Sequence, residues 1–195
     1  PEMSKPEAKT PPADSPAATP EEKAAVGEAL TDARRALGDR NLTEAEDRLA
    51  QATLEATAPE LLAEVDRVQL LARYVGDFWD AVRQHMAKLE SATTITVDGE
   101  ELSIIESTGQ KIIFRVAGKR REYTFEKLPP KLAYWLADNW LDKSNPAAFM
   151  TLGAYQAVAP KGDRQLARQL FEQAAAAGLD VKMLLAELDA EREGK

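Results

Sequence analysis

The sequence contains no cysteine and only one histidine, His85. Without cysteine the chain has no disulfides, thiol nucleophiles or cysteine-based metal sites, and one histidine does not supply a usual zinc site. Its glycines stand singly, which excludes a glycine-rich phosphate-binding loop. No Asp/Asn/Gly run matches a calcium-binding loop. We therefore expect neither a cofactor nor a metal.

Long hydrophobic runs and positive charge are also scarce. No apolar run approaches the roughly 18–20 residues of a transmembrane helix, so we expect no membrane insertion in this segment. The 33 acidic residues outnumber the 25 Lys and Arg residues, and the formal net charge is −8. An acidic surface repels phosphate backbones, so nucleic acid is not an expected partner. The 195 residues, 44% of them hydrophobic, suffice for a sizeable core.

Residues 1–19 consist mainly of Pro, Ala, Lys, Glu, Thr and Ser. Such a segment buries too little apolar area to offset its conformational entropy, so it is predicted to be a disordered linker. Linkers of this composition connect a folded domain to a membrane anchor or to another domain. We therefore expect the soluble part of a larger or anchored bacterial protein, extracytoplasmic or membrane-tethered rather than cytoplasmic. A terminal extension without such a role is the alternative.

Residues 20–90 predict a three-helix unit. Thr19 and Glu22 form a capping box that starts a helix at Pro20, and Gly38 ends it. A second helix is predicted to begin at the capping box of Thr43 and Glu46 and to run to about residue 56. In the third helix, over residues 59–90, nine apolar residues are spaced by alternating steps of four and three. They form one seam roughly 45 Å long, in which Trp79 is a core residue and Gly76 allows a close crossing or a bend.

Residues 91–128 are predicted to form β-strands. The β-branched run Thr93–Val97 ends in Asp98-Gly99, a strong hairpin signal. Three further strands are predicted over Leu102–Ser107, Lys111–Val116 and Arg121–Phe125. The result is a four-stranded antiparallel meander, which is too small to be stable without a partner surface.

Residues 129–195 predict a four-helix unit. The first helix covers about Pro130–Leu141, the second begins at Asn145-Pro146, the third runs from Asp163 to Gly178, and Asp180 caps the fourth. The expected fold class is therefore α+β and mainly helical, with helical hairpins or a bundle on both sides of the β-meander.

Two helical hairpins share a spacing of small and large residues. Ala45, Leu49 and Ala52 recur as Ala167, Phe171 and Ala174, and Leu152-Gly153 precedes the second set. This pattern resembles the tetratricopeptide repeat, whose helices carry a small, a large and a small residue at those steps. The resemblance implies stacked helical hairpins and a protein-binding function. Ordinary helix packing produces the same spacing and remains the alternative.

The β segment carries a second resemblance. A strand over Lys111–Val116, a Gly118-Lys119 turn and a final strand from Tyr123 leading to Leu128 resemble the end of small SH3-like barrels of the Sla1 homology type 1 family. The resemblance implies a closed barrel as the alternative to an open meander. It also implies a module that binds proteins or peptides rather than an enzyme.

Carboxylates supply the main catalytic candidates. Asp138 and Asp142 lie four residues apart beside Trp135, which would suit a carboxylate-dependent glycan-processing or glycan-binding protein. Glycosidases, however, need two carboxylates that face each other across a cleft, and two on one helix face are usually solvated. His85 is either a general base or pH-sensitive contact, or a boundary histidine with one satisfied nitrogen.

Exposed aromatic and basic residues supply the interaction candidates. Trp135 and Trp140 are five residues apart on one helix, so at most one of them should be fully exposed. A basic hairpin tip is formed by Lys119, Arg120 and Arg121. It either binds an acidic partner or stays solvated. We predict a non-catalytic protein-interaction or scaffolding module with a protein partner.

Overall fold

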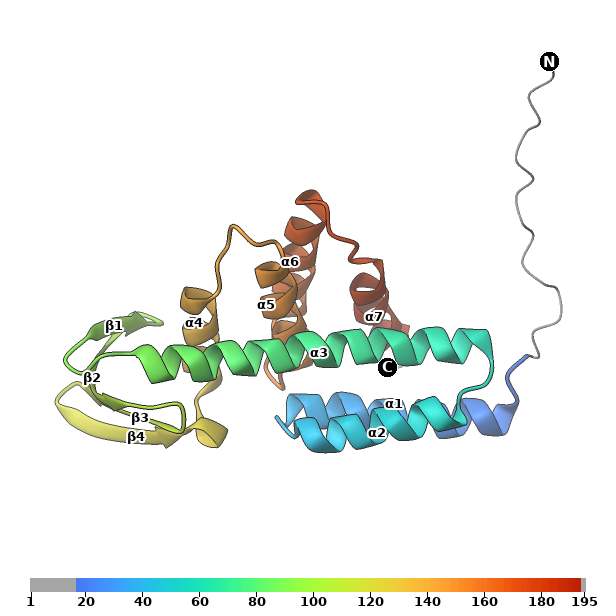
Figure 1. Ribbon diagram of the computed structural model, residues 1–195, viewed down its shortest axis with the longest axis horizontal. Coiled ribbons are helices and arrows are strands. Elements are labelled where there is room, and N and C mark those ends of the chain that lie inside the picture. The colour runs from blue at the N-terminus through green and yellow to red at the C-terminus, as the bar shows by residue number, and fades with distance from the viewer. Residues whose placement is uncertain (1–16, 194–195) are drawn as a thin grey trace, which may run out of the picture.

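The computed structural model describes residues 17–193, with side chains to residue 190 (Figure 1). The linker predicted over residues 1–19 falls mostly outside this range. Over the described residues the chain forms seven α-helices and one four-stranded antiparallel sheet. The predicted fold class, α+β and mainly helical, is confirmed.

The elements follow one another in the predicted order. They are α1 Pro20–Gly38, α2 Leu42–Glu55, α3 Pro59–Lys88, β1 Thr94–Val97, β2 Glu100–Ser107, β3 Lys111–Val116, β4 Lys119–Thr124, the 3₁₀ turn η1 Phe125–Lys127, α4 Pro130–Trp140, α5 Ala147–Val158, α6 Arg164–Ala176 and α7 Lys182–Glu193. Within residues 17–193, no helix combines the length and the hydropathy that crossing a membrane requires.

Helix α3 is the long central helix predicted by the heptad spacing, and it belongs to two cores. Its first half packs Val65 and Val68 with residues of α1 and α2. Its second half carries Phe78, Val82 and Met86 into a larger cluster with strands β1–β3 and helices α4–α7. Figure 1 shows the same division, with α1 and α2 along one half of α3 and the sheet at its far end.

Local sequence signals set the starts of the first two helices. The capping box predicted for α1 is present, since the Glu22 N–H donates to Thr19 Oγ1 at 3.1 Å. The start predicted for α2 at Thr43 was wrong. Asn41 caps that helix because its Oδ1 accepts the Glu44 N–H at 3.3 Å. Arg40, with a φ of 64°, makes the tight turn that places Asn41 there.

Two glycines inside helices have opposite surroundings. A Cβ at Gly76 would meet no atom within 4 Å, so no close crossing occurs there, and α3 continues through it without a break. A Cβ at Gly153 would lie 2.6 Å from Phe171 Cε1. Close packing of α5 on α6 therefore requires glycine at position 153, whereas nothing that packs on α3 requires it at position 76.

The sheet is an open meander in the order β1-β2-β3-β4, with β1 and β4 at its edges. Asp98 and Gly99 make the predicted first turn, both with positive φ. Strand β4 starts earlier than predicted, at Lys119, because Ala117 and Gly118 close a two-residue hairpin. Phe125, predicted as the strand end, lies in η1 instead.

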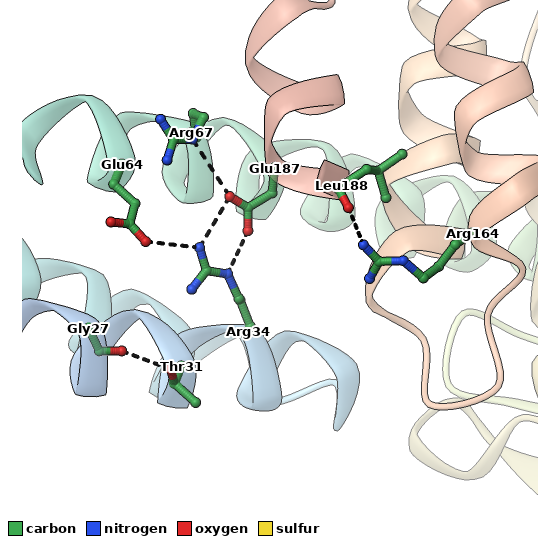
Figure 2. A network of polar contacts seen from close by, with 8 residues as sticks. All are labelled: Gly27, Thr31, Arg34, Glu64, Arg67, Arg164, Glu187 and Leu188. Carbon is green, nitrogen blue, oxygen red and sulfur yellow. Dashed lines mark hydrogen bonds and ion pairs between the residues drawn. The ribbon is translucent and has the colours of Figure 1, made fainter. Parts of the chain in front are cut away.

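An ion cluster centred on one buried carboxylate joins α7 to α1 and α3 (Figure 2). Glu187, whose side chain is 3% exposed, accepts from Arg34 Nε at 2.5 Å and from the Arg34 terminal nitrogen at 3.1 Å. Arg67 Nε lies 3.9 Å from the same carboxylate, and Glu64 lies 3.6 Å from Arg34. Burial opposes the charge on Arg34, but the bonds and charge of Glu187 hold its pKa above the ordinary value.

Candidate functional site

A cleft of about 930 Å³ opens where segments far apart in the sequence meet. Its walls come from the α1–α2 turn at residues 38–40, the β1–β2 turn at residues 97–98 and residue 126 of η1. One side of α4, between residues 129 and 138, and the last turn of α5 with the loop that follows it, at residues 155–162, complete them. Concave sites of this size, lined by aromatic and apolar groups with a few polar ones, are where proteins bind ligands. We refer to it as the α4 cleft.

Arg40 is fixed in the wall of this cleft. Its guanidinium lies 4.5 Å from the centre of the Trp79 ring and donates to the Leu128 carbonyl at 2.7 Å. Burial lowers the pKa of Arg40 below its ordinary value. The guanidinium is therefore held by an aromatic face and a backbone carbonyl, and it presents a fixed cation at the α1–α2 turn.

Two tyrosines form the deeper aromatic surface. Tyr155 is stacked on Phe78 with ring centres 3.9 Å apart and planes within 3°, and its ring centre is 6.3 Å from that of Tyr134. Burial, helped by the charge of Asp138, raises the pKa of Tyr134 to about 12. Tyr134 therefore stays a neutral phenol near neutral pH. It can offer a ring face and a hydroxyl, but not a phenolate base.

Trp135 lines the cleft and belongs to a cluster of three rings, in which it stacks on His85 and Trp140 is tilted against the same ring. The His85 ring centre is 5.6 Å from that of Trp135 and 5.6 Å from that of Trp140. His85 Nδ1 is 2.8 Å from the Leu136 carbonyl oxygen. Because a carbonyl only accepts, Nδ1 carries the proton. His85 is thus the boundary histidine with one satisfied nitrogen, and it positions Trp135. Trp140, 38% exposed, is not part of the cleft wall.

The structure separates the two carboxylates of the glycosidase hypothesis. Asp138 lines the cleft and pairs with Lys143 Nζ at 2.5 Å. Asp142 is not in the wall, and it accepts from the backbone N–H and the hydroxyl of Ser144, each at 2.8 Å. The backbone bond, then the hydroxyl bond, lowers the pKa of Asp142. A carboxylic acid that must donate a proton near neutral pH needs the opposite shift.

The predicted basic tip lies away from this cleft. Lys119, Arg120 and Arg121 are exposed on β4 at an edge of the sheet, and none of them lines the α4 cleft. The structure therefore splits the predicted interaction residues into two places: the aromatic pair on α4, and the cations on β4.

Sequence reasoning missed two charged residues that shape the molecule. Glu187 carried a readable signal, because it lies three residues after Leu184 on the apolar face of its helix. Arg40 carried none, since its role depends on a turn conformation and on Trp79. Among the described residues, no group of three His, Asp or Glu side chains is placed to hold a metal ion.

Comparison of the chain with protein-family models, with curated proteins and with solved structures gave no match.

Proposed function

We propose that this protein is a non-catalytic protein-interaction module that binds a partner through the α4 cleft, with Trp135 as its main contact. The composition of the cleft supports this proposal, because a half-buried tryptophan, tyrosine rings and prolines are combined there with a charged rim. Interfaces concentrate their binding energy in such aromatic anchors near a desolvated centre. The stack on His85 fixes the Trp135 ring before a partner arrives, which lowers the entropy cost of binding.

The charged groups of the cleft favour recognition over chemistry. Lys131 pairs with Asp98, and Asp138 pairs with Lys143. Arg40 is occupied by the Leu128 carbonyl and the Trp79 ring. A catalytic acid or base needs a pKa tuned toward the working pH and a free path to substrate. Paired, rim-exposed charges instead set the orientation and selectivity of a bound partner.

The test compares Trp135 with Trp140, because both rings contact His85 but only Trp135 lines the cleft. A photo-reactive amino acid is placed at exposed Lys131 on the cleft rim, with the exposed Glu172 on α6 as the control position, and crosslinking is done in extract of the source cell. We expect a specific protein adduct from position 131 only. Trp135→Ala should abolish it, whereas Trp140→Ala should retain it, because Trp140 contacts the His85 ring but does not line the cleft.

Thermal melting of both variants separates loss of binding from loss of folding. An adduct that survives Trp135→Ala in a folded protein would refute the assignment of the cleft. Equal loss in both variants would instead mean that the whole three-ring cluster, and not the cleft wall, makes the contact, and it would refute the assignment as well.

A glycan-binding or glycan-processing protein is the second candidate, because Trp135 and Asp138 both line the same cleft. Tryptophan faces stack on sugar rings, and a nearby carboxylate accepts hydroxyl hydrogen bonds. Titration of a chito-oligosaccharide should then quench tryptophan emission in the native protein and not in Trp135→Ala. Hydrolysis lost on Asp138→Ala with the fold intact would favour the enzyme over the binding module.

A further inference from the structure

Strand β4 leaves one side of its backbone free. The Phe125 N–H donates to the Gln110 carbonyl at 2.8 Å, which fixes the phase of the antiparallel ladder between β3 and β4. Hydrogen-bonded pairs alternate along such a ladder. Lys119, Arg121 and Tyr123 therefore direct their backbone groups toward β3. The N–H and C=O groups of Arg120, Glu122 and Thr124 point away from the sheet.

The free edge is accessible. Five of the six residues of β4 are exposed, and Tyr123 is half-buried. In the described part of the chain, no helix or loop forms a backbone hydrogen bond with the outward groups of β4. At the opposite edge of the sheet, helix α4 lies against β1, and its Lys131 pairs with Asp98 in the turn that follows that strand. Figure 1 shows β4 at the outer rim of the sheet, away from α4.

The edge is basic in an otherwise acidic protein. Arg115 of β3 lies directly opposite Arg120 in the register, so two guanidinium groups share one face of the sheet. Lys119 and Arg121 extend from the other face of β4. Arg120 pairs with Glu122 at 3.2 Å. Over residues 17–190, no acidic side chain forms an ion pair with Arg115, Lys119 or Arg121.

We propose that the β4 edge binds an acidic, extended peptide segment of a partner protein by strand addition. The free backbone groups supply the main-chain hydrogen bonds of an added strand, and the cations on both faces select acidic side chains. The same cations disfavour pairing between two copies of β4, because the three cations of each strand outweigh its one carboxylate and leave each edge with a net positive charge. This inference is independent of the function proposed for the α4 cleft.

The first test uses two synthetic probes that differ only in charge. One peptide alternates four Glu with four Val residues, and the other replaces each Glu by Lys; both have blocked ends. We expect the acidic peptide alone to bind at low salt, with amide shift changes and slowed hydrogen exchange centred on Arg120, Glu122 and Thr124. Its affinity should fall steeply as salt rises. Failure of the acidic peptide to bind would overturn the proposal.

Two variants at one position separate backbone pairing from simple charge attraction. Glu122→Gln removes a negative charge from the edge and keeps the outward N–H, so acidic-peptide binding should tighten. Glu122→Pro removes the same charge together with that N–H, and proline is tolerated on the free side of an edge strand. We expect at least tenfold weaker binding than Glu122→Gln. Equal binding by the two variants would show a contact made by charge alone and would overturn strand addition.

A modified peptide keeps the test decisive if proline disturbs β4. The acidic peptide with an N-methyl group on every residue offers no backbone N–H along either of its edges, although its charge is unchanged. It should bind the native protein at least tenfold more weakly than the unmodified peptide. Undiminished binding of the methylated peptide would also overturn the proposal.

Discussion

Replacing Glu187 with Gln should destabilise the protein more than any other single carboxylate-to-amide change on α7. Glu187 is the acceptor for both donors of Arg34 and lies within ion-pair distance of Arg67. The amide keeps the size of the side chain but carries no charge. Two partly buried arginines would then remain, and among the described residues Glu64 would be the only carboxylate still paired with either of them.

The magnitude follows from the burial of the carboxylate. Breaking a buried ion pair by neutralising one partner costs about 3–5 kcal/mol. Because Gln can still accept one hydrogen bond, we expect the lower end, about 3 kcal/mol. For a domain of this size each kcal/mol shifts the Tm by about 2–4 °C, so the Tm should fall by about 6–12 °C. Urea unfolding with unchanged slope would give the same free energy independently.

A neighbouring carboxylate supplies the matched control. Asp189 lies two residues further along α7 and pairs with Arg168, but its side chain is 60% exposed. An exposed pair contributes about 0–1 kcal/mol, so Asp189→Asn should leave the Tm almost unchanged. If Glu187→Gln costs less than about 1 kcal/mol, or no more than Asp189→Asn, the cluster does not hold α7 in place and the reasoning fails.

Two further predictions concern a glycine and a helix cap. Gly76→Ala should raise the free energy of unfolding by about 1 kcal/mol, because an added Cβ meets no atom and alanine favours the helix. Gly153→Ala should lower the free energy of unfolding, because the added Cβ would clash with Phe171. If both variants were less stable than the native protein, the packing described for Gly76 would be contradicted. Hydrogen bonds from the backbone of Thr57, then of Ala58, hold the pKa of Glu22 below its ordinary 4.5. This stabilisation is fully present above pH 4.5 and is lost as the pH falls through the lowered folded-state pKa. Glu22→Gln should therefore reduce the urea midpoint at pH 6 more than at pH 3, and an equal reduction at both would show that the charge is not involved.

Periodic and capping signals predicted most of the fold. The alternating steps of four and three predicted α3 to within two residues at its C-terminal end, because burial of one continuous seam outweighs the single glycine at position 76. The sequence did not identify the capping residue of α2, because two good capping residues lie close together. Asn41 and Thr43 are both good caps, and the left-handed turn at Arg40, which sequence patterns do not show, decides between them.

The cleft could be predicted only in part. Trp135 and Asp138 were identified as candidates because their residue types are typical of binding sites, and both line it. Its other walls come from turns at residues 38–40 and 159–162, whose proximity depends on how α1 meets α5. A Cβ at Gly38 would lie 2.7 Å from the Val158 carbonyl oxygen. Such a long-range contact leaves no periodic trace in the sequence.

The two cores of α3 have a consequence for how this chain can be divided. The sequence of the chain changes from helical patterns to β-branched runs at about Ser91, so a boundary between two domains could be placed there. A fragment cut there would present Phe78, Val82 and Met86 to water, although each is fully buried in the intact protein. We infer that residues 20–90 are not an autonomous folding unit. Cleavage or recombination near residue 91 would leave both halves with exposed apolar surface and therefore prone to aggregate. A chimaera should keep residues 20–90 and the strands that follow them together.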